Sequence, residues 1–210
     1  MAEKGIRQRR EERRKNDNEQ SDARYKEILR AGAQVFRERG YFKAALQDVA
    51  DVVGISRPTL YYYISTKEEL LTEILKGPID EATRMISELA SLDASARDRL
   101  KRAIALHMET IETYHPEMFI FFAERLHVGR RTRRIRENSR LYGEAIAKII
   151  EDGQRRGEFR KDIDARVAML GILGMFNWIH RWYRNGGPLT LPAIGKQFAA
   201  LALDGLRPPP

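Results

Sequence analysis

The chain contains no cysteine and no long apolar run in its 210 residues. Without cysteine it has no disulfide framework and no thiolate chemistry, and it does not depend on an oxidising compartment. No stretch approaches the ~20 consecutive apolar residues needed to span a bilayer, and the charged N-terminus lacks the apolar segment of a secretory signal. These absences predict a cytoplasmic protein that does not enter a membrane.

The clusters of residues that catalysis requires are also missing. The four histidines are His107, His115, His127 and His180, and none stands four residues from another, the spacing of a helical zinc site. Neither a Walker-type loop nor a GxGxxG or GxSxG motif occurs. We therefore expect no enzymatic activity, no bound metal and no cofactor.

Positive charge is in excess. The chain has 38 Lys and Arg against 30 Asp and Glu, a formal net charge of +8, which favours a polyanionic partner through counterion release. Residues 1–20 have almost no apolar side chains and predict a disordered basic arm. The arginines of this arm could lie in a DNA minor groove, or the arm could remain a solvated tail.

The segment from Asp48 to Lys67 predicts two short helices joined by a turn. Apolar residues at helical spacing around Val49 indicate the first helix, and Gly54 follows where the chain needs a positive φ to end it. Ser56 is a good N-cap for the second helix, and Pro58 is tolerated in a first helical turn. This helix is expected from about Arg57 to Ile64.

The outer face of the second helix is polar and aromatic, and the helix is too short to be a major packing element. In a helix-turn-helix the second helix enters the major groove of DNA and its flanks contact phosphates. The alternative is a buried tyrosine cluster in an ordinary helical hairpin. The residues of this face are Arg57, Thr59, Tyr61, Tyr62 and Tyr63, and Gln47 on the preceding helix is a further candidate for base contact.

The chain from about Arg24 to Leu71 resembles the tetracycline-repressor (TetR) family of bacterial transcription regulators. The matching positions are Ile28, Leu29, Ala33, Phe36, Gly40 and Tyr41, then Asp48-Val49-Ala50, Gly54-Ile55-Ser56, Thr59-Leu60-Tyr61 and Lys67-Glu68-Glu69-Leu70. One departure is that Ala44 and Ala45 stand where the family usually has a Thr or Ser that caps the second of its helices and touches phosphate.

The resemblance implies roles for individual residues. Bases or the adjacent backbone would be contacted by Arg57, Pro58, Thr59, Tyr61 and Tyr62. Tyr63 would lie near a phosphate or pack beneath it, and Lys67 would bind a phosphate at the start of the next helix.

All remaining periodic segments are helical, so the chain is predicted to be all-α with about nine helices. A first helix is expected from Ser21 or Asp22 to Arg39, and a fourth from Lys67, broken or kinked at Gly77-Pro78. Further helices are expected at about 95–113, 116–127, 131–157, 164–184 and 191–205. The expected domains are a helix-turn-helix domain at 21–67 and a ligand-binding and dimerisation domain at 68–210.

The last two expected helices are unusually apolar. The segment from Val167 to Ile179 is apolar nearly all round, and Gly171 and Gly174 would let another helix approach closely. Two such helices from each of two copies would form a homodimer that reads a pseudo-palindromic operator; the alternative is an intramolecular core. The expected interface residues are Val167, Leu170, Gly171, Gly174, Trp182, Ile194, Phe198 and Leu201.

Two closing motifs, Arg181-Trp182-Tyr183-Arg184 and Gly186-Gly187-Pro188-Leu189-Thr190, resemble the TetR branch that includes acyl-CoA-responsive repressors of fatty-acid and steroid catabolism. An effector of that class, an acyl-CoA thioester, is what this second resemblance implies.

The stretch from His107 to His127 concentrates methionine and aromatic residues that can line an apolar ligand cavity or form ordinary core. Arg130, Arg131, Arg133, Arg134 and Arg136 follow it, and these could contact the phosphates of a CoA thioester or form a solvated helix start. The residues expected to bind the ligand are His107, Met108, Tyr114, Phe119, Phe122, Arg125 and Trp178.

Together these patterns predict a ligand-responsive, DNA-binding transcription regulator that acts as a repressor and is released by a small apolar effector. The alternative is an α-helical protein-protein interaction module that does not bind DNA.

Overall fold

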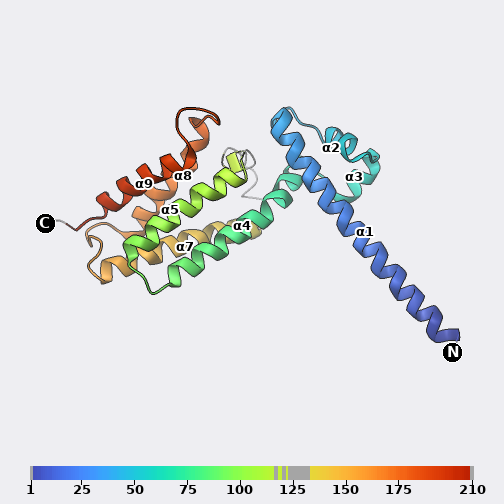
Figure 1. Cartoon of the computed structure of the whole chain (residues 1–210), viewed down its shortest axis with the longest axis horizontal. Coiled ribbons are helices and arrows are strands. Elements are labelled where there is room, and N and C mark those ends of the chain that lie inside the picture. The colour runs from blue at the N-terminus through green and yellow to red at the C-terminus, as the bar shows by residue number, and fades with distance from the viewer. Residues whose placement is uncertain (1, 116–117, 120–121, 123–132, 209–210) are drawn as a thin grey trace. The chain divides into compact units, whose positions relative to one another are not determined.

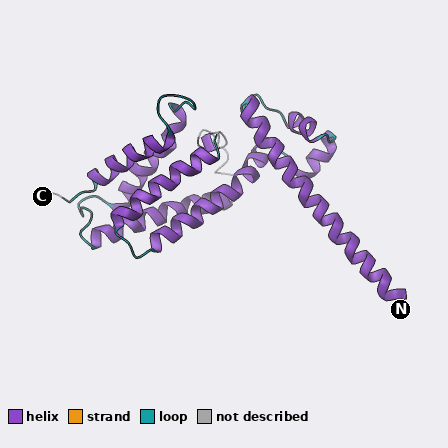
Figure 2. Cartoon of the chain, in the orientation of Figure 1, coloured by secondary structure: helices purple, strands orange, loops and turns teal. Residues whose placement is uncertain are grey.

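The computed structural model describes residues 2–208 except 116–117, 120–121 and 123–132, and it describes side chains from Gln20 onward, that of Arg134 excepted. Within this part of the chain every regular element is a helix, so the all-α prediction is confirmed (Figure 2). The elements are α1 (Ala2–Arg39), α2 (Leu46–Val53), α3 (Arg57–Tyr63), α4 (Lys67–Ser91), α5 (Ala96–Thr113), α7 (Arg133–Arg155), α8 (Ala165–Trp178), the 3-10 helix η1 (Ile179–Arg181) and α9 (Leu191–Gly205) (Figure 1).

The chain divides into two compact units, Met1–Ile74 and Leu75–Pro210, here called the N-terminal and C-terminal units. The division falls beyond residue 67, the expected domain boundary, because the first turns of α4 pack into the N-terminal unit. Leu70 and Leu71 are fully buried there. The Leu70 side chain packs directly against Gly32 of α1, since a Cβ added at Gly32 would lie 2.8 Å from Leu70 Cδ2.

The first helix is longer than expected. The structure begins α1 at Ala2 and not at Ser21 or Asp22, so residues 2–20, expected to be a disordered arm, are described as part of this helix. A low apolar content removes the means of packing, but Lys, Arg, Glu and Gln are good helix formers.

Helix α4 is not broken at Gly77-Pro78, because it continues through Pro78 to Ser91; the alternative of a kink there stays a prediction. A proline inside a helix removes one backbone hydrogen bond, whereas the buried side chains of Leu75 and Ile86 hold the helix on both sides of it. Beyond Thr113, the helix expected at 116–127 lies mostly outside the described residues.

In the C-terminal unit, α5 packs against α9 and α7, and α7 packs against α8 (Figure 1). The core contains a buried ion pair, in which Arg99 donates to the carboxylate of Asp152 at 3.0 Å. Arg99 also donates to the carbonyl oxygen of Ala90 at 2.8 Å. The Arg99 side chain therefore joins the end of α4 to α5 and α7. Lys148 donates to the same two acceptors, each at 3.1 Å.

Candidate nucleic-acid interface and ligand cavity

The α2–turn–α3 segment has the local geometry that its sequence predicts. Gly54 ends α2 at φ 72°, in the left-handed region that favours glycine, and Ile55 N then donates to the Ala50 carbonyl at 3.0 Å. Ser56 caps α3, since its Oγ accepts from Thr59 N at 3.2 Å, and Pro58 lies in the first helical turn. These features fix how α3 leaves the turn.

One face of α3 is buried and the other is open to solvent. Leu60 and Ile64 are fully buried, whereas Tyr61 is 40% and Tyr62 81% exposed. Tyr63 is half-buried, and its ring centroid lies 6.4 Å from that of Tyr25 on α1. The alternative of a buried tyrosine cluster therefore fits only Tyr63. The other residues expected to contact DNA on this face, Arg57, Pro58 and Thr59, are exposed.

Arg57 and Tyr61 are held together one helical turn apart. The guanidinium carbon of Arg57 lies 5.3 Å from the centroid of the Tyr61 ring, and Nη2 donates to the Tyr61 hydroxyl at 3.3 Å. Gln47, exposed on α2, donates to Asp51 at 2.8 Å. A surface hollow brings Gln47, Arg57, Tyr61 and Lys67 together. Two cations, an amide, a hydroxyl group and an aromatic ring thus share one open surface.

Lys67 is directed at the loop between α1 and α2. Its ammonium donates to the carbonyl oxygens of Tyr41 at 2.8 Å, Phe42 at 3.3 Å and Ala44 at 3.0 Å, and it lies 4.6 Å from the centroid of the Tyr41 ring. All three N–H donors of an ammonium are thereby used. The phosphate contact expected of Lys67 stays a prediction, and the structure adds a role that the sequence did not indicate.

The first backbone N–H at the start of α2 is capped from within the helix. Ala45, at the N-cap, has no side-chain acceptor, but the Asp48 carboxylate accepts from Ala45 N at 2.8 Å and from Arg39 at 2.5 Å. In the same loop, Phe42 is 78% exposed and Lys43 is exposed. An open aromatic ring and a cation beside the hollow are candidates for DNA contact that sequence analysis missed, because no periodic signal marks a loop.

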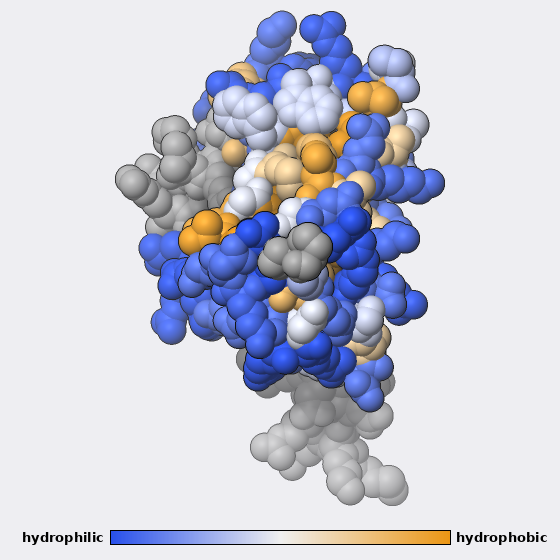
Figure 3. All heavy atoms as spheres, turned by 90° about the vertical axis from the view of Figure 1, so that its left-hand side faces the viewer, coloured by the Kyte–Doolittle hydropathy of each residue, from blue (hydrophilic) through white to orange (hydrophobic). Residues whose placement is uncertain are grey.

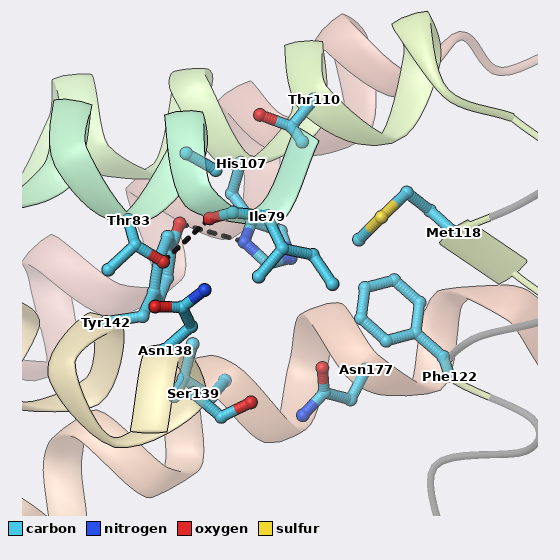
Figure 4. A pocket seen from close by; sticks show the side chains of 12 residues that line it. Ile79, Thr83, His107, Thr110, Met118, Phe122, Asn138, Ser139, Tyr142 and Asn177 are labelled. Carbon is cyan, nitrogen blue, oxygen red and sulfur yellow. Dashed lines mark hydrogen bonds between the residues drawn. The ribbon is translucent and has the colours of Figure 1, made fainter. Parts of the chain in front are cut away.

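The C-terminal unit contains a largely apolar cavity of about 80 Å³ (Figure 4). At ~10–15 Å³ for each water-sized group, it holds a small moiety and not a whole coenzyme. Its described lining residues carry no formal charge. They are Ile79, Ala82, Thr83, His107, Thr110, Met118, Phe122, Asn138, Ser139, Tyr142, Leu173 and Asn177.

His107 of α5 lies at the centre of this lining. Its ring stacks on that of Phe176, with centroids 4.4 Å apart. Its Nδ1 lies 3.0 Å from the Tyr142 hydroxyl (Figure 4). Burial lowers the pKa of His107 to about 3 and raises the pKa of Tyr142, so both side chains are neutral at ordinary pH.

Only part of the expected ligand set lines the cavity. His107 and Phe122 do so, whereas Arg125 lies outside the described residues. Met108 faces α9, where it contacts Gly195, and Phe119 packs near Tyr183 with ring centroids 5.7 Å apart. Tyr114 and Trp178 are also absent from the lining and are exposed, the latter with Arg181 5.3 Å from its ring centroid.

The structure describes only some of the arginines between residues 130 and 136. Residues 130–132 lie outside the described residues, as does the side chain of Arg134, whereas Arg133 and Arg136 are exposed on α7.

Helix α8 is apolar on two opposite faces. Its inner face contributes Ile172 and Phe176 to the core, and its outer face exposes Val167 (62%) and Leu170 (58%). Figure 3 shows apolar atoms among hydrophilic ones on the side of the C-terminal unit that it displays. Of the residues expected at a dimer interface, the exposed ones are Val167, Leu170, Gly171, Gly174, Trp182 and Leu201. Ile194 is buried within the unit and Phe198 is half-buried there, so these two belong at least partly to the intramolecular core.

Neither a metal site nor a membrane span is found in the described part of the chain. No group of three or more His, Asp or Glu residues is placed to hold a metal ion there. None of the described helices is both long and apolar enough to cross a bilayer.

Comparison with known proteins identifies the family. Residues 28–74 match the model of bacterial regulatory proteins of the tetR family, and residues 93–206 match that of the tetracyclin repressor-like C-terminal domain. The chain belongs to the TetR family and is a helix-turn-helix, DNA-binding transcription regulator. The alternative of an interaction module that does not bind DNA is not favoured.

Individual relatives are similar over nearly their whole length. The chain is 30% identical over 197 residues to the HTH-type transcriptional repressor KstR2 of Rhodococcus jostii, covering 92% of this chain and 96% of that protein. The structure of the ketosteroid transcriptional regulator KstR2 of Mycobacterium tuberculosis is 29% identical with a TM-score of 0.74, covering 88% and 95%. The structure of AibR in complex with isovaleryl coenzyme A and operator DNA is 25% identical with a TM-score of 0.69, covering 89% and 99%.

Proposed function

We propose that this chain is a homodimeric repressor that binds a pseudo-palindromic operator through two copies of α3 and is released by an acyl-CoA thioester. The observation that carries the DNA-binding part is the exposed face of α3, with Arg57 stacked on Tyr61 over a fully buried Leu60. The repressor names of its relatives support repression, and the isovaleryl coenzyme A bound to AibR supports the effector class.

The α3 assignment is tested by a gel shift against the DNA upstream of the protein's own gene. Tyr61→Ala should abolish specific binding, because it removes the ring and hydroxyl that hold Arg57, while the C-terminal unit stays folded. Tyr114→Ala is a matched control, since Tyr114 is 37% exposed against 40% for Tyr61 but lies in the C-terminal unit. Survival of both affinity and sequence preference in Tyr61→Ala would refute the assignment.

The homodimer is proposed on the outer face of α8. A Cβ added at Gly174 meets nothing within 4 Å in the single chain, so Gly174→Glu should leave each chain folded. Across a closely packed, two-fold interface it would bury two carboxylates without partners, and we expect light scattering to show a monomer. Gly77→Glu is the control, because Gly77 is also exposed on a helix and equally open. A wild-type chain that stays monomeric at every concentration would contradict the proposal.

The effector class is supported by the cavity, which offers an apolar, uncharged lining to an acyl group. The nucleotide end of a coenzyme A thioester would remain outside a space of about 80 Å³. Isovaleryl-CoA should raise the melting temperature of the protein and weaken operator binding, because a ligand shifts the equilibrium toward the state it binds better. A probe that stabilises the protein while leaving DNA affinity unchanged would argue against release by this class.

A further inference from the structure

His107 has a polar atom in the cavity region that the protein itself does not satisfy. The residue is only 9% exposed, and while Nδ1 meets the Tyr142 hydroxyl, Nε2 is buried without a hydrogen-bond partner among the described residues. Leaving a buried polar group unpaired is costly, so this atom calls for an explanation, and a ligand in the cavity provides one.

The pairing with Tyr142 decides what Nε2 offers. A neutral imidazole carries one N–H, and a phenol carries one O–H that must find an acceptor. Within the described residues the hydrogen bond recorded for the Tyr142 hydroxyl is the one with His107, at 3.0 Å. If the phenol donates to Nδ1, the imidazole proton sits on Nε2. In the opposite arrangement Nδ1–H donates to the phenol oxygen, which leaves both the Tyr142 O–H and the lone pair of Nε2 without a partner.

The surroundings define the chemistry of the acceptor. The polar residues of the described lining, among them Thr83, Asn138 and Asn177, are uncharged, and no described lining residue offers a cation. A carboxylate would be buried here without a counter-charge, which is strongly unfavourable. A neutral carbonyl oxygen fits both the N–H donor and the apolar walls.

We propose that Tyr142 holds His107 in the Nε2–H tautomer and that Nε2–H donates to the thioester carbonyl oxygen of the effector. This inference rests on the proposed effector class and adds the residues that distinguish a thioester from a free acid or an alkyl chain. Tyr142 is the positioning residue and His107 the binding residue.

The tautomer is tested without any ligand by ¹⁵N NMR of the histidine side chains of the full chain, with His107→Phe to assign the signal. We expect an unprotonated Nδ1 and a protonated Nε2 for His107, and loss of that preference in Tyr142→Phe. A protonated Nδ1 would overturn the inference and leave the proposed function untouched.

The carbonyl contact is tested with two probes, isovaleryl-CoA and its 3-methylbutyl thioether, which lacks only the carbonyl oxygen. The wild type should bind the thioester about 3- to 10-fold more tightly, the range expected for one neutral hydrogen bond. His107→Phe keeps an aromatic ring against Phe176 and should bind both probes equally; Tyr142→Phe should reduce the preference. Both variants should bind operator DNA normally when no probe is present.

Equal affinities of the wild type for the two probes would overturn the carbonyl contact while the effector class stands. Failure of both probes to bind or to release DNA would overturn the effector class and this inference together.

Discussion

At the scale of single residues, burial of His107 makes stability depend on pH. The pKa of His107 is lowered from 6.5 to about 3 by desolvation, so below pH 6.5 the unfolded chain takes up a proton that the folded chain does not. The free energy of unfolding therefore falls as pH decreases from 6.5 toward 3. From pH 7 to pH 5 this group should cost about 2 kcal/mol.

Urea unfolding of the wild type and of His107→Phe at pH 7 and pH 5 measures this contribution. Carboxylates titrate in both proteins, so the variant should lose less stability than the wild type over this range. An equal loss in the two proteins would show that His107 is not desolvated.

The second prediction at this scale concerns Lys67, which donates to three carbonyl oxygens of the α1–α2 loop. Lys67→Met should remove about 1–2 kcal/mol of local stability, because hydrogen bonds from a charged donor are lost. Amide hydrogen exchange of residues 41–45 should become faster. Lys43→Met, in the same loop at an exposed position, should leave the exchange unchanged; similar exchange in both variants would remove this role from Lys67.

Among the elements, α5 and α9 pack tightly where Gly195 of α9 meets Met108 of α5. A Cβ added at Gly195 would lie 2.6 Å from Met108 Cγ. Gly195→Ala should therefore destabilise the C-terminal unit by about 1–3 kcal/mol through overpacking, although alanine itself favours a helix.

The matched control is Gly205→Ala at the end of the same helix, where an added Cβ meets nothing within 4 Å. Thermal unfolding should show a lower melting temperature for Gly195→Ala and no loss for Gly205→Ala. Equal melting temperatures would mean that α9 can shift away from α5 at little cost.

Helices α2 and α3 could be predicted because their signals are local. Gly54 ends α2 in the left-handed region and Ser56 caps α3, and each effect involves residues within a few positions along the chain. Met108 could not be placed in the same way. Apolar periodicity marks it as buried, but only the packing of α9 shows that it faces Gly195 and not the cavity.

At the scale of the whole molecule, a dimer would place two copies of each DNA-contacting charge on the operator. Each such charge should therefore contribute twice to the slope of log K against log salt concentration. Arg57→Gln should reduce the slope of log K against log salt concentration by about 2, since each phosphate charge neutralised contributes about 0.9 and a dimer presents two copies. Arg207→Gln, exposed in the C-terminal unit, is the control and should leave the slope unchanged. A slope that Arg57→Gln does not alter would show that Arg57 does not neutralise a phosphate.

Helical periodicity, turn residues and caps were enough to predict an all-α regulator with a helix-turn-helix, because each acts over a few neighbouring residues. Tertiary structure alone paired Nδ1 of His107 with Tyr142, 35 positions away, and turned Lys67 toward a loop 23 to 26 positions earlier. It also divided the apolar circumference of α8 into a core face and an open face. Such pairings depend on which helices pack together, and no pattern within one helix records its neighbours.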